Sequence, residues 1–332
     1  MTLSERIEAF AVLGDKIGNI STEEMTEYAY RAQSENQWFT EDNVKRAFEG
    51  IRFMLEKSKL DEWINRYGEL NPEIPKIVGV IMAGNIPLVG FHDLMCVLIS
   101  GHFAAIKASS QDSFLLKLVI SWLLEIEPRL KKNLELRERL NSVEALIATG
   151  SDNTARYFEY YFKDQPKIIR KNRTSIAVLD GSETSEELHD LGKDIFWYFG
   201  LGCRNVSKVF VPKGYNAATF FEAVEDYSFI GDHYKYRNNY DYHKSILLVN
   251  GTKHLDNGFL LWLTTENLVS PISILHAQEY ANKEELESII ESYGDKLQCV
   301  IGKGYIPFGS GQLPEPWDYA DNVDTIEFLK GL

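Results

Sequence analysis

The residue with the clearest chemical potential is Cys203, in the stretch 196–212, which reads FWYFGLGCRNVSKVFVP. Two glycines flank Leu201 just before it, and glycine permits backbone angles and a close ligand approach that other residues do not. A thiolate is favoured by nearby positive charge and by backbone N–H groups, and Arg204 and Lys208 offer the charge. The pattern predicts a nucleophilic cysteine at a turn. The alternative is a buried structural thiol, a frequent state of free cysteine.

A second chemical signal is a set of three polar residues at the ends of apolar, strand-like runs. Asn85 follows the run at 77–82, Lys107 closes the run at 103–107, and Ser151 follows a third run. Strand, polar or glycine turn, and helix repeat three times, which is typical of a parallel sheet with crossover helices. Because such sheets bind ligands at the carboxyl ends of their strands, we expect the three residues along one edge.

Helices must surround these strands. Apolar residues at three-to-four spacing predict a helical layer over 2–70, with Thr40 as an N-cap inside it. The later helices are expected at 87–100, 113–127 and 152–162, and the third and fourth strands at 142–148 and 168–169. Asn85 therefore has a structural alternative, because it can cap a helix that starts near residue 87.

The second half of the chain is expected to be α/β again. Its strands are predicted at 175–179, 206–211, 245–249, 258–263, 272–276 and 299–301, and its helices at 183–199, 215–225 and 283–293. Residues 226–242 are aromatic, polar and predicted to be irregular, and 304–311 form a loop. We expect a nucleotide-cofactor domain over 1–177, to which 305–332 can return, and a catalytic domain over 178–304.

Length, charge and cysteine content restrict the class of protein. A chain of 332 residues is long enough for two domains. Its three cysteines are too few and too scattered for a disulfide framework or a metal site, which favours a reducing compartment. The N-terminus does not read as a signal peptide and no apolar run could span a bilayer, so we expect a cytoplasmic protein. A net charge of −14 argues against nucleic acid as a partner.

Taken in order, several of these stretches resemble the aldehyde dehydrogenase superfamily and, within it, the LuxC-like fatty acyl-CoA reductases. The similarity runs from residue 77 to the C-terminus. The motifs that carry it are 84–88 (GNIPL), 101–111 (GHFAAIKASSQ), 149–151 (TGS), 199–212 (FGLGCRNVSKVFVP) and, as a faint echo, 266–271 (ENLVSP). The resemblance implies an aldehyde dehydrogenase-like α/β fold, with a Rossmann-type cofactor domain and an α/β catalytic domain.

The resemblance also implies roles for individual residues. Cys203 would be the nucleophile, and the Asn85 amide with the Cys203 N–H would bind the oxyanion. The cofactor-binding residues would be Lys107, Ser109, Ser110, Gly150, Ser151 and Glu266. Ser110 stands where members that prefer NAD often carry a glutamate. Because serine can donate to a 2′-phosphate, NADPH is the expected cofactor and NADH the alternative.

A missing carboxylate bears on the reaction. Hydrolytic members carry a glutamate shortly before the stretch matched by 173–175, and this chain reads IIRKNR at 168–173. Without a base that activates water, an acyl group on Cys203 can be reduced instead of hydrolysed. This favours an NADPH-dependent acyl-CoA reductase that forms an aldehyde from a fatty acyl thioester. The basic residues Arg170, Lys171 and Arg173 would attract coenzyme A phosphates or form a solvated turn.

Other interpretations remain open at this point. The same features fit a reductase of acyl phosphates, or a subunit that carries acyl groups or binds the cofactor without turnover. The resemblance also allows a homo-oligomer or a complex with acyl-transfer and ligase partners, although the projecting hairpin that many members use to oligomerise has no evident counterpart. The aromatic stretch 227–242 could line an acyl tunnel or simply pack. His233 and His243 are more typical of ordinary histidines than of a general acid, and Cys96 and Cys299 of core residues.

Overall fold

The computed structural model describes residues 1–332, apart from the side chain of Asp152. The chain forms two compact units, one built from residues 1–172 and 313–332 and the other from residues 173–312. The sequence analysis placed the boundary after residue 177 and the return at 305. Among the described residues, no helix has the length and apolar character needed to cross a membrane.

The sheet of the first unit is entirely parallel, as the repeated strand, turn and helix pattern predicted. Its strands lie in the order β3-β2-β1-β4-β5. They are β1 (Ile77–Ile81), β2 (Phe103–Lys107), β3 (Leu134–Leu136), β4 (Ala145–Thr149) and β5 (Lys167–Arg170). The chain builds outward from β1 to β3 and then returns to the other side of β1. The strand order therefore reverses between β1 and β4, which is where open α/β sheets bind ligands.

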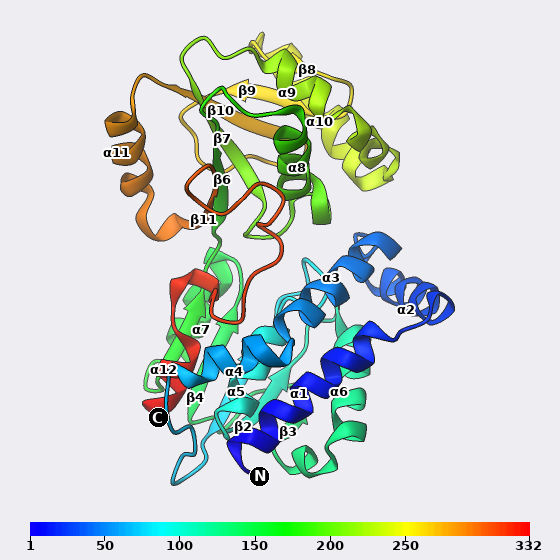
Figure 1. Ribbon diagram of the computed structural model, residues 1–332, viewed down its shortest axis with the longest axis vertical. Helices are drawn as coiled ribbons and strands as arrows, with labels where there is room; N and C mark the ends of the chain where they lie inside the picture. The colour runs from blue at the N-terminus through cyan, green and yellow to red at the C-terminus, as the bar shows by residue number, and fades with distance from the viewer. The chain divides into compact units, whose positions relative to one another are not determined.

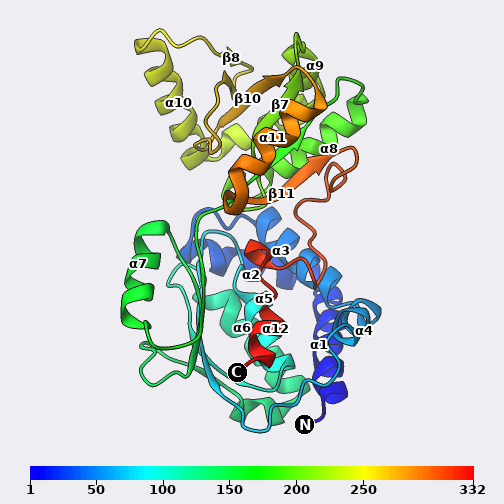
Figure 2. The ribbon, with the colours of Figure 1, turned by 90° about the vertical axis from the view of Figure 1, so that its left-hand side faces the viewer.

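Helices cover both faces of this sheet. They are α1 (Leu3–Gly18), α2 (Thr22–Glu35), α3 (Glu41–Met54), α4 (Lys57–Asn65), α5 (Phe91–Ile99), α6 (Ser113–Ile126), α7 (Asp152–Tyr161) and α12 (Thr325–Lys330). Figure 2 shows α7 on one face and α5, α6 and α12 on the other, with α1 and α4 outside them. Thr40 is the N-cap of α3, as predicted, and its side chain accepts a hydrogen bond from the Asn43 N–H.

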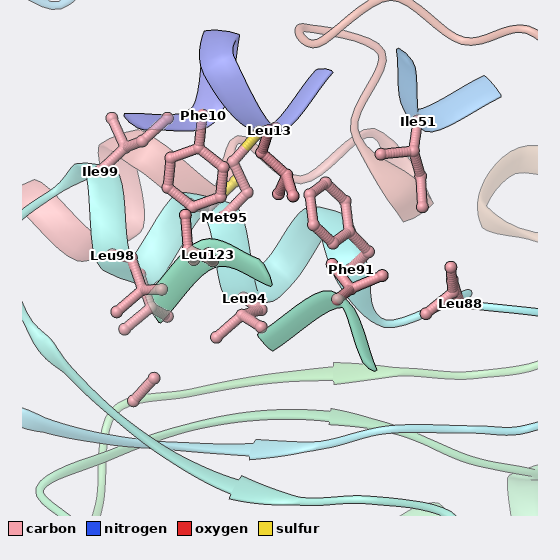
Figure 3. Close-up of a cluster of buried hydrophobic side chains, with 14 of the residues drawn as sticks. Phe10, Leu13, Ile51, Leu88, Phe91, Leu94, Met95, Leu98, Ile99 and Leu123 are labelled. Atoms are coloured by element: carbon pink, nitrogen blue, oxygen red, sulfur yellow. The ribbon is translucent and has the colours of Figure 1, made fainter. Parts of the chain in front are cut away.

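The main core of the first unit surrounds α5. Apart from His92 and Asp93 this helix is apolar, so it must be covered nearly all round, and every residue from Phe91 to Ile99 except His92 is buried. Phe10 and Leu13 of α1 point toward Phe91 and Met95 in Figure 3, and the Phe10 and Phe91 rings meet edge to face with centroids 6.2 Å apart. The helical layer over 2–70 therefore packs on α5, which covers one face of the five-stranded sheet.

The second unit contains a six-stranded sheet in the order β11-β6-β7-β10-β9-β8, parallel except for β8, which runs antiparallel to β9. The strands are β6 (Thr174–Val178), β7 (Val206–Pro212), β8 (Leu255–Asp256), β9 (Leu261–Thr264), β10 (Ile274–Tyr280) and β11 (Leu297–Gly302). The helices are α8 (Ser185–Phe196), α9 (Ala217–Ala223), α10 (Tyr234–Val249) and α11 (Lys283–Tyr293). Figure 1 shows α8 and α11 on opposite sides of this sheet. The predicted α/β fold class is confirmed in both units.

Two predictions for the second unit were wrong. The aromatic stretch 226–242 is not irregular, because a 3-10 helix (Glu225–Asp232) and then α10 occupy it. The run 245–249 is not a strand but the end of α10. Tyr236, Tyr240 and Leu247 are the buried residues of α10, and their spacing is helical. The apolar run 245–249 suggested a buried strand, but apolar residues alone do not show burial. The last residue of the run, Val249, is 86% exposed and does not belong to a core.

Candidate active site

The chain approaches Cys203 through an unusual backbone. Helix α8 ends at Phe196 instead of the predicted residue 199, and Tyr198, Phe199 and Gly200 follow with φ angles of 53°, 57° and 76°. Two consecutive bulky residues in the left-handed region cost free energy that surrounding contacts must offset. Phe199 is buried against His233, with ring centroids 4.4 Å apart. Packing therefore fixes the segment that leads to the cysteine.

Cys203 lies in a β-turn closed by the Asn205 N–H, which donates to the Gly202 carbonyl at 3.0 Å. The Asn205 side chain, 2% exposed, also accepts from the Gly202 N–H at 2.8 Å. Its amide donates to the carbonyls of Asp194 at 3.0 Å and Trp197 at 2.9 Å. One buried asparagine thus ties the turn to the end of α8. Cys203 itself is half-buried and forms no disulfide, so the sealed structural thiol is not what the structure shows.

A glycine loop is held beside the turn by Asp194. The Asp194 carboxylate has no exposed surface and accepts from the N–H groups of Gly309 at 2.7 Å and Gly311 at 2.8 Å. Arg204 donates from Nε to the Gly311 carbonyl. Burial raises the pKa of Asp194 to about 7. The sequence analysis missed Asp194, although it shares a helix face with Leu191 and Ile195, and a carboxylate on an apolar face is a detectable signal.

Lys208, one of the two cations expected to serve the cysteine, is engaged elsewhere. Its side chain is completely buried on β7, and its ammonium donates to the Glu266 carbonyl at 2.8 Å, the Tyr293 hydroxyl at 3.1 Å and the Gln278 side chain. Burial lowers the pKa of Lys208 to about 8. None of these acceptors belongs to the turn. Glu266 contributes its carbonyl here, and its carboxylate is exposed.

In the first unit, Asn85, Lys107 and Ser151 follow neighbouring strands at one edge of the sheet. Ile81 pairs with Lys107 on β2 and with Ala148 on β4, and the Met82 N–H donates to the Lys107 carbonyl at 3.1 Å. Asn85 is exposed. The capping alternative for Asn85 is wrong, because α5 begins only at Phe91 and its N-cap is Gly90.

The loops that follow β1 and β2 are interlocked. A Cβ at Gly84 would lie 2.5 Å from the Ser109 Oγ, so only glycine fits there. Asp112 accepts from the Leu88 N–H at 2.6 Å, and Leu88 has a φ of 57°. Burial raises the pKa of Asp112 to about 8. Asp112, which the sequence analysis did not single out, fixes the loop that carries Asn85.

The exposed groups at this edge suit a dinucleotide. Among the residues that the structure describes, the Lys107 ammonium makes no hydrogen bond or ion pair, and Lys107 and Ser110 are both exposed. Ser151 caps α7, accepting from the Thr154 N–H at 3.3 Å, and Gly150 precedes it with its N–H bound to the Arg170 carbonyl at 3.2 Å. A free cation, a hydroxyl and a helix start where the strand order reverses fit a pyrophosphate and its riboses.

Within the basic stretch at 170–173, Arg170 fits neither sequence interpretation, whereas Lys171 is exposed. Arg170 is 3% exposed and holds the Asp93 carboxylate with two hydrogen bonds of 2.7 and 3.2 Å. It also donates to the Thr325 hydroxyl at 2.9 Å and to the Ala320 carbonyl. Lys171 forms an ion pair with Glu159 at 3.0 Å. Arg170 is therefore neither solvated nor open to phosphates.

The remaining candidates are distributed between core and surface. In the aromatic stretch, Tyr236 and Tyr240 are buried, whereas Phe229, Tyr234 and Tyr242 are more than half exposed. His243 is half-buried. Cys96 is a core residue, as predicted. Cys299 is half-buried instead of fully buried, and its sulfur lies 3.0 Å from the Ser175 hydroxyl.

Comparison with known proteins places the chain in a family. A family model described as "Acyl-CoA reductase (LuxC)" matches residues 16–225. This span includes Asn85, Lys107, Ser151 and Cys203. Among curated proteins, a long-chain acyl-protein thioester reductase from Aliivibrio fischeri is 24% identical over 183 residues, covering 50% of this chain and 38% of that protein. The match thus spans well under half the length of this relative.

Solved structures show the same fold at low identity. An aldehyde dehydrogenase from Bacillus cereus in complex with NAD+ is 15% identical, with a TM-score of 0.63 over 91% of this chain and 72% of that one. The indole-3-acetaldehyde dehydrogenase AldA from P. syringae is 11% identical, with a TM-score of 0.65 over 87% of this chain and 70% of that one. The fold is that of the aldehyde dehydrogenases, as the sequence motifs predicted.

Proposed function

The chain belongs to the acyl-CoA reductase (LuxC) family of the aldehyde dehydrogenase superfamily, and we propose that it reduces a fatty acyl-CoA thioester to the aldehyde with NADPH. The observation that carries the proposal is the Cys203 turn, a half-buried thiol on a backbone locked by buried side chains, inside the matched region. Locked backbone of this kind is typical of groups held in a reactive geometry.

Cys203 begins the reaction. Its thiolate attacks the thioester carbonyl, the carbon becomes tetrahedral, and its oxygen takes the negative charge. The carbonyl then re-forms, the bond to the coenzyme A sulfur breaks, and coenzyme A leaves as a thiolate that takes up a proton. The acyl group remains on the Cys203 sulfur as a new thioester. We assign the stabilisation of the oxyanion to the Cys203 N–H and the Asn85 side-chain amide, and removing one such donor typically costs about 3–4 kcal/mol of barrier.

The next step requires that water does not remove the acyl group. The stretch 168–173 contains no carboxylate, and Arg170 within it is bound to Asp93. A base that activates water is therefore absent from the stretch where hydrolytic relatives carry one. When bound, a reduced nicotinamide would supply the hydride for the acyl carbon, and Cys203 would leave as a thiolate when the aldehyde forms.

We assign the cofactor to the open edge of the first sheet. Lys107 and the Ser109–Ser110 turn would hold the adenosine ribose, and the start of α7 at Ser151 the pyrophosphate. Since the Gly150 N–H is bound to the Arg170 carbonyl, Gly150 would serve by letting the pyrophosphate approach the backbone closely. Glu266, whose carboxylate is exposed, would contact the nicotinamide ribose. The relative named a long-chain acyl-protein thioester reductase supports a long acyl chain as the substrate.

Purified protein incubated with NADPH and acyl-CoAs of graded chain length tests the proposal. We expect loss of the reduced nicotinamide absorbance together with an equal amount of free coenzyme A thiol. Acyl phosphate as the only accepted substrate would favour the alternative reductase. A protein that binds NADPH but consumes none with any acyl donor would be the non-turnover subunit and would contradict the proposal.

A further inference from the structure

The carbonyl of Cys203 has a partner that the motif does not reveal. In the turn closed by Asn205, the Cys203 carbonyl is not used by the turn itself, so its hydrogen-bond partner lies outside the turn. The hydroxyl of Ser175, at the start of β6 and with no exposed surface, donates to this carbonyl at 3.0 Å. Ser175 and Cys203 are brought together because β6 and β7 are neighbouring parallel strands.

The Ser175 hydroxyl is itself oriented by β11. The Cys299 N–H donates to the Ser175 Oγ at 3.2 Å, and the Cys299 sulfur lies 3.0 Å from the same oxygen. A hydroxyl has one proton and two acceptor positions. The Cys203 carbonyl can only accept, so the hydroxyl proton serves this bond, and the Cys299 N–H and thiol then fill the two acceptor positions of the oxygen. In this arrangement the hydroxyl points its proton at Cys203.

These contacts fix both peptide planes that flank Cys203. A peptide group is planar, so once its two Cα atoms are in place a hydrogen bond to its oxygen fixes the rotation of the whole plane. The Asn205 N–H holds the Gly202 carbonyl, which fixes the plane that contains the Cys203 N–H. The Ser175 hydroxyl holds the Cys203 carbonyl, which fixes the following plane. With both planes held, the Cα–Cβ bond of Cys203 and its N–H keep a set direction.

We propose that Ser175 is a positioning residue for Cys203, acting through the hydrogen bond from its hydroxyl to the Cys203 carbonyl. The inference rests on the proposed function in so far as Cys203 is the nucleophile. A residue that holds a reacting group in place typically contributes about 10- to 100-fold to the rate. The reason is that a small misplacement of the reacting group lowers the rate without weakening substrate binding.

Ser175→Ala tests the proposal, with Ser207→Ala as the matched control. The Ser207 hydroxyl lies at the start of β7, donates to the Leu268 carbonyl at 3.1 Å and contacts the Thr174 hydroxyl at 2.6 Å, so its loss removes two comparable contacts away from the turn. We expect Ser175→Ala to lower kcat about 10- to 100-fold with KM for acyl-CoA changed less than about 3-fold. We expect Ser207→Ala to leave both constants within about 3-fold of the wild-type values. Equal kcat values in the two variants would overturn the proposal.

Two further measurements keep the result decisive. Cys299→Ala keeps the backbone N–H and the Ser175 hydroxyl, so we expect kcat within about 3-fold of wild type, and a loss as large as that of Ser175→Ala would contradict the assignment. Hydrogen exchange needs no substrate: Ser175→Ala should speed exchange of the Gly202 and Asn205 amides, and Ser207→Ala should not. If wild-type protein reduces no acyl-CoA, the proposed function fails and hydrogen exchange alone tests the role of Ser175. Unchanged exchange of the Gly202 and Asn205 amides in Ser175→Ala would then overturn that role.

Discussion

At the scale of single residues, the Cys203 turn and the Asn85 loop are each held by a buried polar side chain. Asn205 uses its side chain for three hydrogen bonds around the turn, and Asp112 holds the Leu88 N–H of the loop. Asp112 lies just outside the motif at 101–111, and Asn205 lies inside the cysteine motif at 199–212 but was not singled out there. Motifs reveal the groups that would touch a substrate. The residues that hold those groups in place act through hydrogen bonds to partners that only the fold brings close.

Asn85→Ala tests the assigned oxyanion donor. Because the side chain is exposed, we expect the free energy of unfolding to change by less than about 0.5 kcal/mol. We expect kcat to fall about 100- to 1000-fold, as for the loss of one oxyanion donor. Steady-state kinetics with acyl-CoA and a urea titration check the two expectations. A kcat within threefold of wild type would remove Asn85 from the reaction.

Ser110→Glu tests the cofactor preference. A carboxylate beside the adenosine ribose would repel a 2′-phosphate, so we expect KM for NADPH to rise by at least about 10-fold while KM for NADH changes little. Ser110→Ala is the control, since it removes a donor without adding charge and should have a smaller effect. Wild-type protein that already prefers NADH would show that the interpretation of Ser110 is wrong.

At the scale of elements, the sequence predicted the helices and strands whose apolar residues recur at a clear spacing. It failed where the amino-acid composition of a stretch suggested a different structure from that spacing. The strand at 103–107 and the helix at 283–293 have the predicted bounds. In α10 the aromatic residues mask a helical spacing of buried positions, so the sequence indicated an irregular stretch followed by a strand. The fate of Lys208 could not be predicted, because its acceptors Glu266, Gln278 and Tyr293 come from distant parts of the chain.

Arg170→Met tests the buried contact that links β5, α5 and the segment that contains Thr325. Removing the guanidinium leaves the Asp93 carboxylate buried without its partner, so we expect the free energy of unfolding to fall by about 3–5 kcal/mol. Lys171→Met is the control, because the Lys171–Glu159 pair is about half exposed and should contribute about 1 kcal/mol or less. Urea titration measures both, and equal losses would contradict the account.

At the scale of the whole molecule, stability should depend on pH through the buried carboxylates. The pKa of Asp194 is raised from 3.8 to about 7. Between these values the folded protein holds a proton that the unfolded chain has lost. The contribution of Asp194 to stability is therefore present below pH 4 and lost as the pH rises through 7, at up to about 1.4 kcal/mol per pH unit.

Asp194→Asn isolates this contribution from other titrating groups. We expect the free energy of unfolding of the wild type, relative to the variant, to decrease between pH 5 and pH 7. Lys208 adds no pH dependence between pH 5 and pH 7, because with a pKa of about 8 it is charged in both the folded and the unfolded protein in that range. Urea titrations of the two proteins at several pH values give the difference, and a difference independent of pH would contradict the assignment of Asp194.

The central claim is that Cys203 carries the acyl group, and intact-mass spectrometry tests it most directly. Wild-type protein mixed with acyl-CoA in the absence of NADPH should gain the mass of one acyl group and release one equivalent of free thiol. The adduct should disappear when NADPH is added and should not form in Cys203→Ala. An adduct that persists in Cys203→Ala, or wild-type turnover without any adduct, would contradict the account.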